Sequence, residues 1–318
     1  MTKNTIKLGL IGLGRMGQNH LRVLSILKSV DLKFVYDYDF KKAQELANNH
    51  DTNAYENLDE AFNQELDAIV ICSPTSTHAE YIEKAASFVK NIFVEKPITA
   101  TLDEAKKVSK IVNDNNINLQ VGFIERFNPA VAQLKNILDS TKKVMSIDFT
   151  RTNKLSRITD VDVITDLMVH DVDLALHLNG DVEKVSANGV IRNDLIVFSS
   201  AILTHKNGKF SRIQASCVTE KKMRKIEATC EDLFVDCDLL KKEITVIKQS
   251  ETFQEDGKPY KITSTHENIE VKQQEALLLE LQSFISVCQG ETVTINPTAN
   301  DGVNAIEICD KIQSEIYK

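Results

Sequence analysis

Short apolar runs alternate with longer segments of helical periodicity over roughly the first 120 residues. Apolar runs bounded by turn residues predict buried strands, and apolar positions that recur every three or four residues predict helices between them. The expected strands are 6–11, 32–36, 68–72, 91–94 and 119–123, and the expected helices are 16–28, 40–49, 77–89 and 102–113. Strands that alternate with helices of this length predict a doubly wound α/β domain, a parallel sheet covered on both faces.

The pattern changes near residue 144, where strand-like segments follow one another with only short polar turns between them. The dipeptides Asn207-Gly208 and Asp256-Gly257 are typical of hairpin turns. The expected strands are 144–151, 185–191, 196–204, 210–218, 225–230, 233–236, 244–248 and 260–265, with helices at 127–139, 166–178, 273–289 and 299–316. The second part is therefore expected to be an α+β domain with a mostly antiparallel, open sheet.

Length and composition support two globular domains. A chain of 318 residues suits two domains, which we place at 1–122 and 123–318, with the helix 299–316 packing back on the first domain. The formal net charge is −8 without a block of basic residues, which argues against nucleic acid and anionic membrane surfaces as partners. No apolar run reaches the ~20 residues of a membrane helix. The six cysteines form no C-x-x-C pair, and the chain starts without a signal-peptide pattern, so we expect free thiols and a cytoplasmic protein.

A glycine-rich turn directly follows the first predicted strand and opens the first predicted helix. It reads Gly12-Leu13-Gly14-Arg15-Met16-Gly17. In such a G-x-G-x-x-G turn, Gly12 permits the tight bend, Gly14 lets the backbone approach a pyrophosphate, and Gly17 lets helix and sheet pack closely. The free amides of the helix N-terminus, here those around Arg15 and Met16, then face the phosphates. The turn predicts a dinucleotide site.

An acidic residue in the right place selects the dinucleotide. Asp37 ends the second predicted strand, 20 residues after Gly17. A carboxylate there accepts hydrogen bonds from the adenosine ribose hydroxyls and repels a 2′-phosphate, so we expect NAD rather than NADP. The plain alternative is an ordinary helix-start turn followed by a solvated strand-end aspartate.

Polar clusters also follow two later strands, at the sheet edge where open α/β sheets place ligands. One reads Ser73-Pro74-Thr75-Ser76-Thr77-His78 and the other Glu95-Lys96-Pro97. A third motif, D-x-x-x-H-D, spans 166–171. Together with the glycine turn, in this order, these motifs resemble the Gfo/Idh/MocA family of sugar and cyclitol oxidoreductases over nearly the whole chain.

The resemblance implies roles for the residues in these motifs. The strand end with Ser73, Thr75 and His78 would line the cofactor cleft, and Glu95-Lys96-Pro97 would place Lys96 beside the nicotinamide. The D-x-x-x-H-D helix would face the active site. His78 has an alternative as a structural helix cap. The family also implies a homodimer or homotetramer built on the open sheet.

Two stretches resemble one subgroup, the UDP-N-acetylglucosamine 3-dehydrogenases. They are G-F-I-E-R-F-N-P at 122–129 and D-L-M-V-H-D-V-D-L at 166–174. Members of the subgroup oxidise the C3 hydroxyl of the sugar to a ketone and usually supply an aminotransferase. Phe123 replaces the subgroup's histidine, and Asp162 stands where a glycine is common. Arg126 would contact the cofactor or an anionic group, or form an ordinary ion pair.

Oxidation of a secondary alcohol needs a hydride acceptor and a base for the hydroxyl proton. Burial near an oxidised nicotinamide would lower the pKa of Lys96, and His170 titrates near neutrality unaided, so either is a credible base. Asp166 precedes His170 by four residues, which places both on one helix face, where Asp166 can orient the imidazole. We expect a Lys96/His170 pair supported by Asp166.

The same helix also permits a metal-binding interpretation, because Asp173 and His177 repeat the four-residue spacing of Asp166 and His170. Residues 166 and 173 lie ~10 Å apart along a helix, too far for one ion to use all four side chains. We therefore expect no metal.

The sequence thus predicts an NAD-dependent dehydrogenase of a UDP-linked sugar, with UDP-N-acetylglucosamine as substrate. One alternative is a dehydrogenase of a free sugar, a sugar phosphate or inositol. Another is a non-catalytic, NAD-binding regulator, which would be expected to have lost the lysine or histidine motif.

Overall fold

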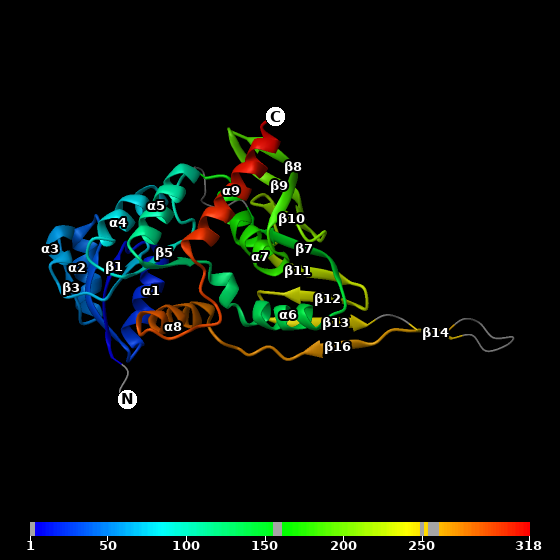
Figure 1. The fold of residues 1–318 in the computed structure, drawn as a ribbon, viewed down its shortest axis with the longest axis horizontal. Helices are drawn as coiled ribbons and strands as arrows, with labels where there is room; N and C mark the ends of the chain where they lie inside the picture. The colour runs from blue at the N-terminus through cyan, green and yellow to red at the C-terminus, as the bar shows by residue number, and fades with distance from the viewer. Residues whose placement is uncertain (1–3, 155–160, 249–250, 254–260) are drawn as a thin grey trace. The chain divides into compact units, whose positions relative to one another are not determined.

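The structure is a computed structural model that describes residues 4–154, 161–248, 251–253 and 261–318 (Figure 1). The chain forms two units. Unit 1 comprises Met1–Phe127 and Glu275–Glu307, and unit 2 comprises Asn128–Gln274 and Ile308–Lys318. The division differs from a simple cut after residue 122, because Glu275–Glu307 returns to unit 1.

Unit 1 is built on a parallel sheet, as the sequence predicts, but the sheet has six strands instead of the five expected, because the two-residue strand β3 gave no pattern. Its strand order is β3-β2-β1-β4-β5-β6. The strands are β1 (Ile6–Ile11), β2 (Val30–Tyr36), β3 (Asn53–Ala54), β4 (Ala68–Ile71), β5 (Asn91–Glu95) and β6 (Asn118–Gly122). Strand order reverses between β1 and β4, and open α/β sheets bind ligands at the carboxyl ends of the strands beside such a switch point.

Helices cover both faces of this sheet and bury its central strands. They are α1 (Arg15–Ile26), α2 (Phe40–Asn49), α3 (Leu58–Phe62), α4 (His78–Ala85), α5 (Leu102–Asp114) and α8 (Ala276–Cys288). The apolar stripe Leu277, Leu281 and Phe284 of α8 joins Leu21 and Leu24 of α1 in the core beside β1. Helix α8 therefore completes the unit-1 core although it comes late in the chain, and Figure 1 shows α1 and α8 side by side.

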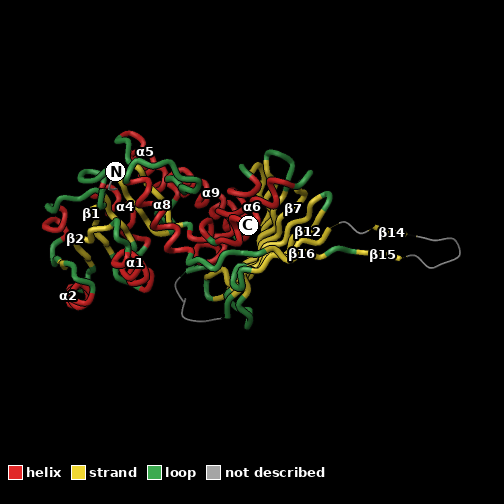
Figure 2. The backbone as a smooth tube through the Cα atoms, turned by 90° about the horizontal axis from the view of Figure 1, so that it is seen from below, coloured by secondary structure: helices red, strands yellow, loops and turns green. Residues whose placement is uncertain are grey.

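Unit 2 contains an open eight-stranded sheet of order β16-β13-β12-β11-β7-β10-β9-β8. All neighbours are antiparallel except β7 and β10, so the prediction of a mostly antiparallel sheet is confirmed. The strands are β7 (Val144–Thr152), β8 (Val182–Arg192), β9 (Leu195–His205), β10 (Phe210–Ser216), β11 (Met223–Cys230), β12 (Leu233–Asp238), β13 (Glu243–Lys248) and β16 (His266–Ile269). Figure 2 shows the strands of this sheet running side by side.

Three helices and a small hairpin complete the described chain. Helix α6 (Pro129–Ser140) precedes β7, and α7 (Val169–Asn179) follows it after a π-helical turn at Ile164–Met168. Strands β14 (Glu251–Phe253) and β15 (Lys261–Thr263) pair only with each other. Helix α9 (Ala299–Ile316) contributes its first residues to unit 1 and its last to unit 2.

The structure differs from the predicted elements in a few places. The Asn207-Gly208 turn joins β9 and β10, with Gly208 at φ +80°, as expected. The Asp256-Gly257 turn lies outside the described residues, as does residue 260, the first of the predicted strand 260–265. Asn193 and Asp194, both at positive φ, form a further hairpin turn between β8 and β9 that the sequence pattern did not reveal. Across the described part of the chain, no helix is both long and apolar enough for a bilayer crossing.

Candidate active site

The three glycines of the turn between β1 and α1 have different surroundings. Gly12 has φ +89°, and a side chain there would meet the backbone nitrogen of Ser73 at 2.4 Å. A Cβ on Gly17 would lie 1.9 Å from the carbonyl oxygen of Gly12. Gly14 has an ordinary φ of −61°, and a Cβ there would meet nothing within 4 Å. The fold therefore requires Gly12 and Gly17, whereas Gly14 leaves open space where a ligand can approach the backbone.

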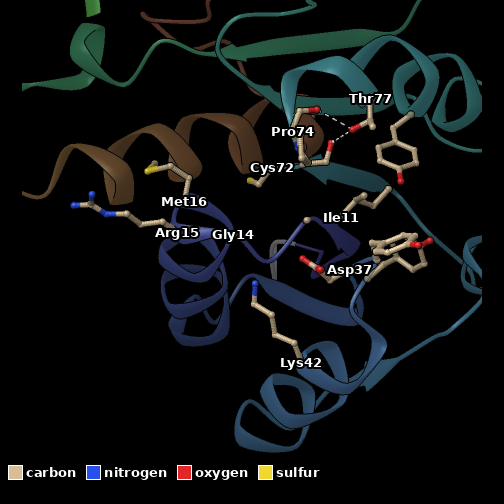
Figure 3. A pocket seen from close by; sticks show the side chains of 14 residues that line it. Ile11, Gly14, Arg15, Met16, Asp37, Lys42, Cys72, Pro74 and Thr77 are labelled. Atoms are coloured by element: carbon tan, nitrogen blue, oxygen red, sulfur yellow. Dashed lines mark hydrogen bonds between the residues drawn. The ribbon is translucent and has the colours of Figure 1, made fainter. Parts of the chain in front are cut away.

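A cavity of about 620 Å³ opens beside this turn at the carboxyl ends of β1, β2 and β4 (Figure 3). This volume lies within the usual range for small-molecule sites. The lining residues come from the turn and α1, from the end of β2 and α2, and from the segment after β4. They are Ile11, Gly12, Gly14, Arg15, Met16, Tyr36, Asp37, Tyr38, Lys42, Cys72, Ser73, Pro74, Thr77 and Tyr81. The cavity thus coincides with the predicted dinucleotide site.

Asp37 is fixed at the edge of this cavity by backbone amides. Its Oδ2 accepts a hydrogen bond from the Leu13 amide at 2.6 Å, and its Oδ1 accepts one from the Asp39 amide at 3.0 Å. Because each carboxylate oxygen has more than one lone pair, both remain able to accept from a ribose hydroxyl. Figure 3 shows Lys42 of α2 entering the cavity on the side of Asp37.

His78 does not line the cavity; its ring lies between the segments that follow β4 and β5. The ring is buried, with Nδ1 at 2.9 Å from the Pro97 carbonyl oxygen and Nε2 at 2.9 Å from the Ser73 carbonyl oxygen. Burial lowers the pKa of His78, although both carbonyl contacts oppose that shift. The ring therefore ties the segment after β4 to the Lys96-Pro97 turn, whose peptide bond is cis. Thr75 lies in the short 3₁₀ turn Thr75–Thr77 before α4.

Glu95 is a buried anchor for the turn that carries Lys96. Its Oε1 lies 2.7 Å from Nε2 of His20, and its Oε2 accepts the Lys96 amide at 3.2 Å. His20 is fully buried on α1, one turn after Gly17. No sequence motif contains His20. Its place next to Leu21, on the apolar face of the predicted helix, is the signal that could have predicted its burial. Lys96 itself is half-buried.

Cys72 lies beside the His20–Glu95 pair. The ring nitrogen, thiol sulfur and carboxylate oxygen that His20, Cys72 and Glu95 could offer to a metal ion lie within 4.8 Å of one another. Burial, with added repulsion from Glu95 and Glu280, raises the pKa of the Cys72 thiol well above its ordinary value. In the described structure, this group is a hydrogen-bonded His20–Glu95 pair beside the Cys72 thiol.

The buried Arg126 forms an ion pair with the half-buried Asp301 inside unit 1. Its Nη2 lies 2.9 Å from Oδ1 of Asp301 near the start of α9, and its guanidinium lies 5.7 Å from the ring centroid of Phe123. The other carboxylate oxygen, Oδ2, accepts the amide and hydroxyl of Thr298, both at 2.7 Å. Burial alone would raise the pKa of Asp301, but Arg126 and Thr298 hold it below its ordinary value. This geometry matches the ion-pair alternative for Arg126.

In unit 2, Asp166 and His170 occupy consecutive turns of different helix types. Asp166 lies within the π-helical turn and His170 is the second residue of α7, and both are half-buried. The neighbouring Asp171 is buried in a bidentate pair with Arg151, through Nε–Oδ2 and Nη2–Oδ1 contacts of 2.7 Å each. Among the residues that the structure describes, the predicted stripe of Asp166, His170, Asp173 and His177 does not gather around one point.

Comparisons with known proteins agree with this picture. Residues 6–123 match the model of an oxidoreductase family with an NAD-binding Rossmann fold, and residues 148–233 match that of a GFO/IDH/MocA C-terminal domain. The chain is 27% identical over 303 residues to the UDP-N-acetylglucosamine 3-dehydrogenase of Acidithiobacillus ferrooxidans, and the match covers 94% of this chain and 92% of that protein. It is 28% identical to an inositol 2-dehydrogenase of Rhizobium meliloti, over 96% of this chain and 95% of that one.

A further relative, the uncharacterized oxidoreductase YrbE of Bacillus subtilis, is 33% identical, but the match spans only 59% of this chain and 58% of that protein. The solved structure of the Acidithiobacillus ferrooxidans dehydrogenase superposes with a TM-score of 0.87 at 25% identity, over 98% of this chain and 97% of that one. The two family models, the near-complete coverage by dehydrogenases and the glycine turn beside its cavity lead to one conclusion: this chain belongs to the Gfo/Idh/MocA family of NAD-dependent oxidoreductases.

Proposed function

We propose that the chain oxidises the C3 hydroxyl of UDP-N-acetylglucosamine to the 3-keto sugar, with NAD as hydride acceptor. The observation that carries the proposal is the similarity, over 94% of this chain, to a dehydrogenase of that name. The stretch 122–129, G-F-I-E-R-F-N-P, supports the same substrate.

The cavity of unit 1 suits the cofactor. Gly14 leaves the space that a pyrophosphate needs, the amides at the start of α1 face it, and Asp37 offers a carboxylate to the adenosine ribose. When bound, NAD accepts the hydride from the carbon that carries the reacting hydroxyl. Ser73, Arg15 and Met16 line the same cavity and are assigned to cofactor binding. Thr75 is assigned to it by its place in the strand-end motif.

Lys96 and His170 are the two residues assigned to the hydroxyl proton. Lys96 lies in a turn that two contacts fix: the Lys96 amide donates to Oε2 of Glu95, and the Pro97 carbonyl contacts the His78 ring. A lysine in such a turn can hydrogen-bond the hydroxyl and either remove its proton or stabilise the alkoxide. His170 is the alternative base, with Asp166 orienting its ring or contacting a sugar hydroxyl.

A dehydrogenase of inositol is the second candidate, because the match to an inositol 2-dehydrogenase covers 96% of the chain. Arg126 does not separate the two candidates, since its Nη2 pairs with Asp301 within the protein. A non-catalytic NAD-binding regulator is disfavoured by the presence of both Lys96 and His170.

A homodimer or homotetramer through the open face of the unit-2 sheet is part of the proposal. Val190, Ile202 and Phe210 share one face of β8, β9 and β10 by strand register, and each is more than 40% exposed. Ile202 and Phe210 are diagonal neighbours on this face and Val190 lies four positions farther along, and exposed apolar side chains on one sheet face favour an interface. The ketone product would be consumed by an aminotransferase.

The test is a spectrophotometric assay of NAD reduction with UDP-N-acetylglucosamine, in which an aminotransferase and an amino donor remove the ketone. We expect reduction with the wild-type chain and none with Lys96→Met, which should still bind NAD. Reduction with inositol but not with the UDP sugar would replace the first candidate by the second. Binding of NAD without reduction of any sugar or cyclitol would favour the regulator.

A further inference from the structure

The chain enters the helix that carries His170 through a π-helical turn. At Ile164–Met168 the amide of Val169 donates to the carbonyl of Ile164, five residues back instead of four. Such turns are rare and occur frequently at functional sites. The sequence pattern predicted an ordinary helix from residue 166, so the widened turn changes where Asp166 is placed before His170.

One residue supplies the hydrogen bonds that start this turn. Oδ1 of Asp162 accepts from the amides of Ile164 and Thr165, each at 2.9 Å. The carbonyl oxygen of Asp162 accepts the amide of Asp166 at 3.1 Å. Free amides at a helix start need acceptors, and Asp162 satisfies three of them, including the amide of the candidate catalytic residue itself.

The other carboxylate oxygen of Asp162 is held from a distant part of the sequence. Its Oδ2 accepts a hydrogen bond of 2.6 Å from Nε2 of Gln313, which lies on the unit-2 part of α9. A hydrogen bond to a charged acceptor is stronger than one between neutral groups. Gln313 therefore fixes the rotamer that lets Oδ1 reach the two amides.

A second contact fixes α7 at Asp171, the residue that directly follows His170. The Arg151–Asp171 pair immobilises the first turn of α7 within the core of unit 2. With α7 fixed there, the position of the preceding turn depends on Asp162. A glycine at position 162, common in the resembling subgroup, would keep the carbonyl that accepts the Asp166 amide, but it has no side chain to accept the amides of Ile164 and Thr165 or to reach Gln313.

We propose that Asp162, held by Gln313, is a positioning residue that sets the placement of Asp166 relative to His170. The inference rests on the proposed function, in which these two residues serve the reaction, and adds two residues that no motif contains. Asp162 acts through the backbone of the turn and needs no contact with substrate.

The experiment compares Asp162→Ala, Asp162→Asn and Gln313→Met with the wild-type chain. Asp162→Asn keeps an acceptor for the two amides, and Gln313→Met removes only the amide contact at similar size. The matched control is Asp238→Ala, because Oδ1 of Asp238 also accepts two backbone amides, those of Leu240 and Lys241 at 2.9 and 3.1 Å, in the same unit.

Two kinds of measurement are made on the full-length protein. The first is kcat with the UDP sugar or inositol together with the KM for NAD. The second is the NMR position of the His170 ring signals, assigned by their loss in His170→Gln, which needs no substrate. We expect Asp162→Ala to lower kcat by about 10- to 100-fold at unchanged KM for NAD, as misplacement of a catalytic group does. It should also displace the His170 signals.

Gln313→Met should act in the same direction with a smaller effect, and Asp162→Asn should retain most of kcat. Asp238→Ala should lower the melting temperature without either change. The proposal is overturned if Asp162→Ala leaves the His170 signals where they are, or changes kcat no more than Asp238→Ala does. Should Asp162→Ala not fold, unmoved His170 signals in Gln313→Met would overturn it equally. If the wild-type chain reduces no NAD with any substrate, the proposed function fails, and the His170 signals still decide this inference.

Discussion

Gly14→Ala separates what the dinucleotide turn does for folding from what it does for binding. The backbone at Gly14 has φ −61°, which alanine adopts without strain, and a Cβ there would meet no atom within 4 Å. The glycine is thus unnecessary to the fold. We predict that the variant folds normally and binds NAD poorly.

The expected stability change is small because two effects oppose each other. Replacing glycine by alanine restricts the unfolded chain and stabilises by about 0.4–1 kcal/mol. Gly14 is also the N-cap residue of α1, where alanine is less favourable than glycine by a similar order. The free energy of unfolding should therefore stay within about 1 kcal/mol of wild type.

The expected change in binding is larger, because the new methyl group occupies the space beside the pyrophosphate. We expect the dissociation constant for NAD to rise at least about tenfold, or ~1.4 kcal/mol. At an NAD concentration of 100 times the wild-type dissociation constant, ligand binding stabilises the wild-type chain by about 2.7 kcal/mol. The same concentration would stabilise a tenfold weaker variant by only about 1.4 kcal/mol.

The assay is urea unfolding of Gly14→Ala and wild type with and without NAD, together with calorimetric titration of the cofactor. Gly17→Ala is the contrasting variant, because its Cβ would lie 1.9 Å from a backbone oxygen and should destabilise the free protein. Unchanged NAD affinity in Gly14→Ala would refute the placement of the pyrophosphate at this turn. A loss of stability equal to that of Gly17→Ala would refute the claim that position 14 is open.

Three further predictions concern charged groups. Asp37→Ala should weaken NAD more than NADP in calorimetric titrations, because the carboxylate that repels a 2′-phosphate is gone; equal losses would contradict its assignment. Asp171→Asn removes the carboxylate charge that pairs in bidentate fashion with the buried guanidinium of Arg151, so urea unfolding should show a loss of about 3–5 kcal/mol, and a loss below about 1 kcal/mol would contradict the importance of the pair. The lowered pKa of Asp301 means that its contribution to stability is present above the ordinary aspartate pKa of about 3.9 and is lost as the pH falls through the lower folded value. Unfolding midpoints measured down this acid range should therefore fall less steeply in Asp301→Asn than in wild type, and parallel curves would show that the Arg126 pair does not set this pKa.

Local signals in the sequence sufficed for most elements of the fold. The strand Ile6–Ile11 and the helices Phe40–Asn49 and Ala299–Ile316 lie where the pattern predicted them. The helix Leu102–Asp114 begins with the capping hydrogen bonds of Thr101 and Glu104, which sequence spacing alone makes recognisable. In each case the information lies within one segment, as hydrophobic period or capping residue.

Features that depend on distant contacts were not predictable. Strand β3 has two residues, too few for any period, and exists because it pairs with β2. Asp162, whose side chain accepts amides of the π-helical turn, is hydrogen-bonded to Gln313, 151 positions later in the sequence. His20 and Glu95 are 75 positions apart, and neither residue type indicates the other without the fold.

The position of the candidate site was easier to predict from its glycine turn than from its polar side chains. Glycine spacing directly encodes the turn, so the cavity formed where expected. From the sequence, polar residues of the strand-end motifs could either bind a ligand or hold the fold together, because a buried polar group needs a hydrogen-bond partner in either case. Glu95, His78 and Arg126 each meet that need with protein partners, whereas Asp37 keeps acceptor capacity at a cavity edge. Residues that hold the scaffold and residues assigned to the ligand thus share motifs, and the hydrogen-bond partners in the folded chain are what distinguish the two groups.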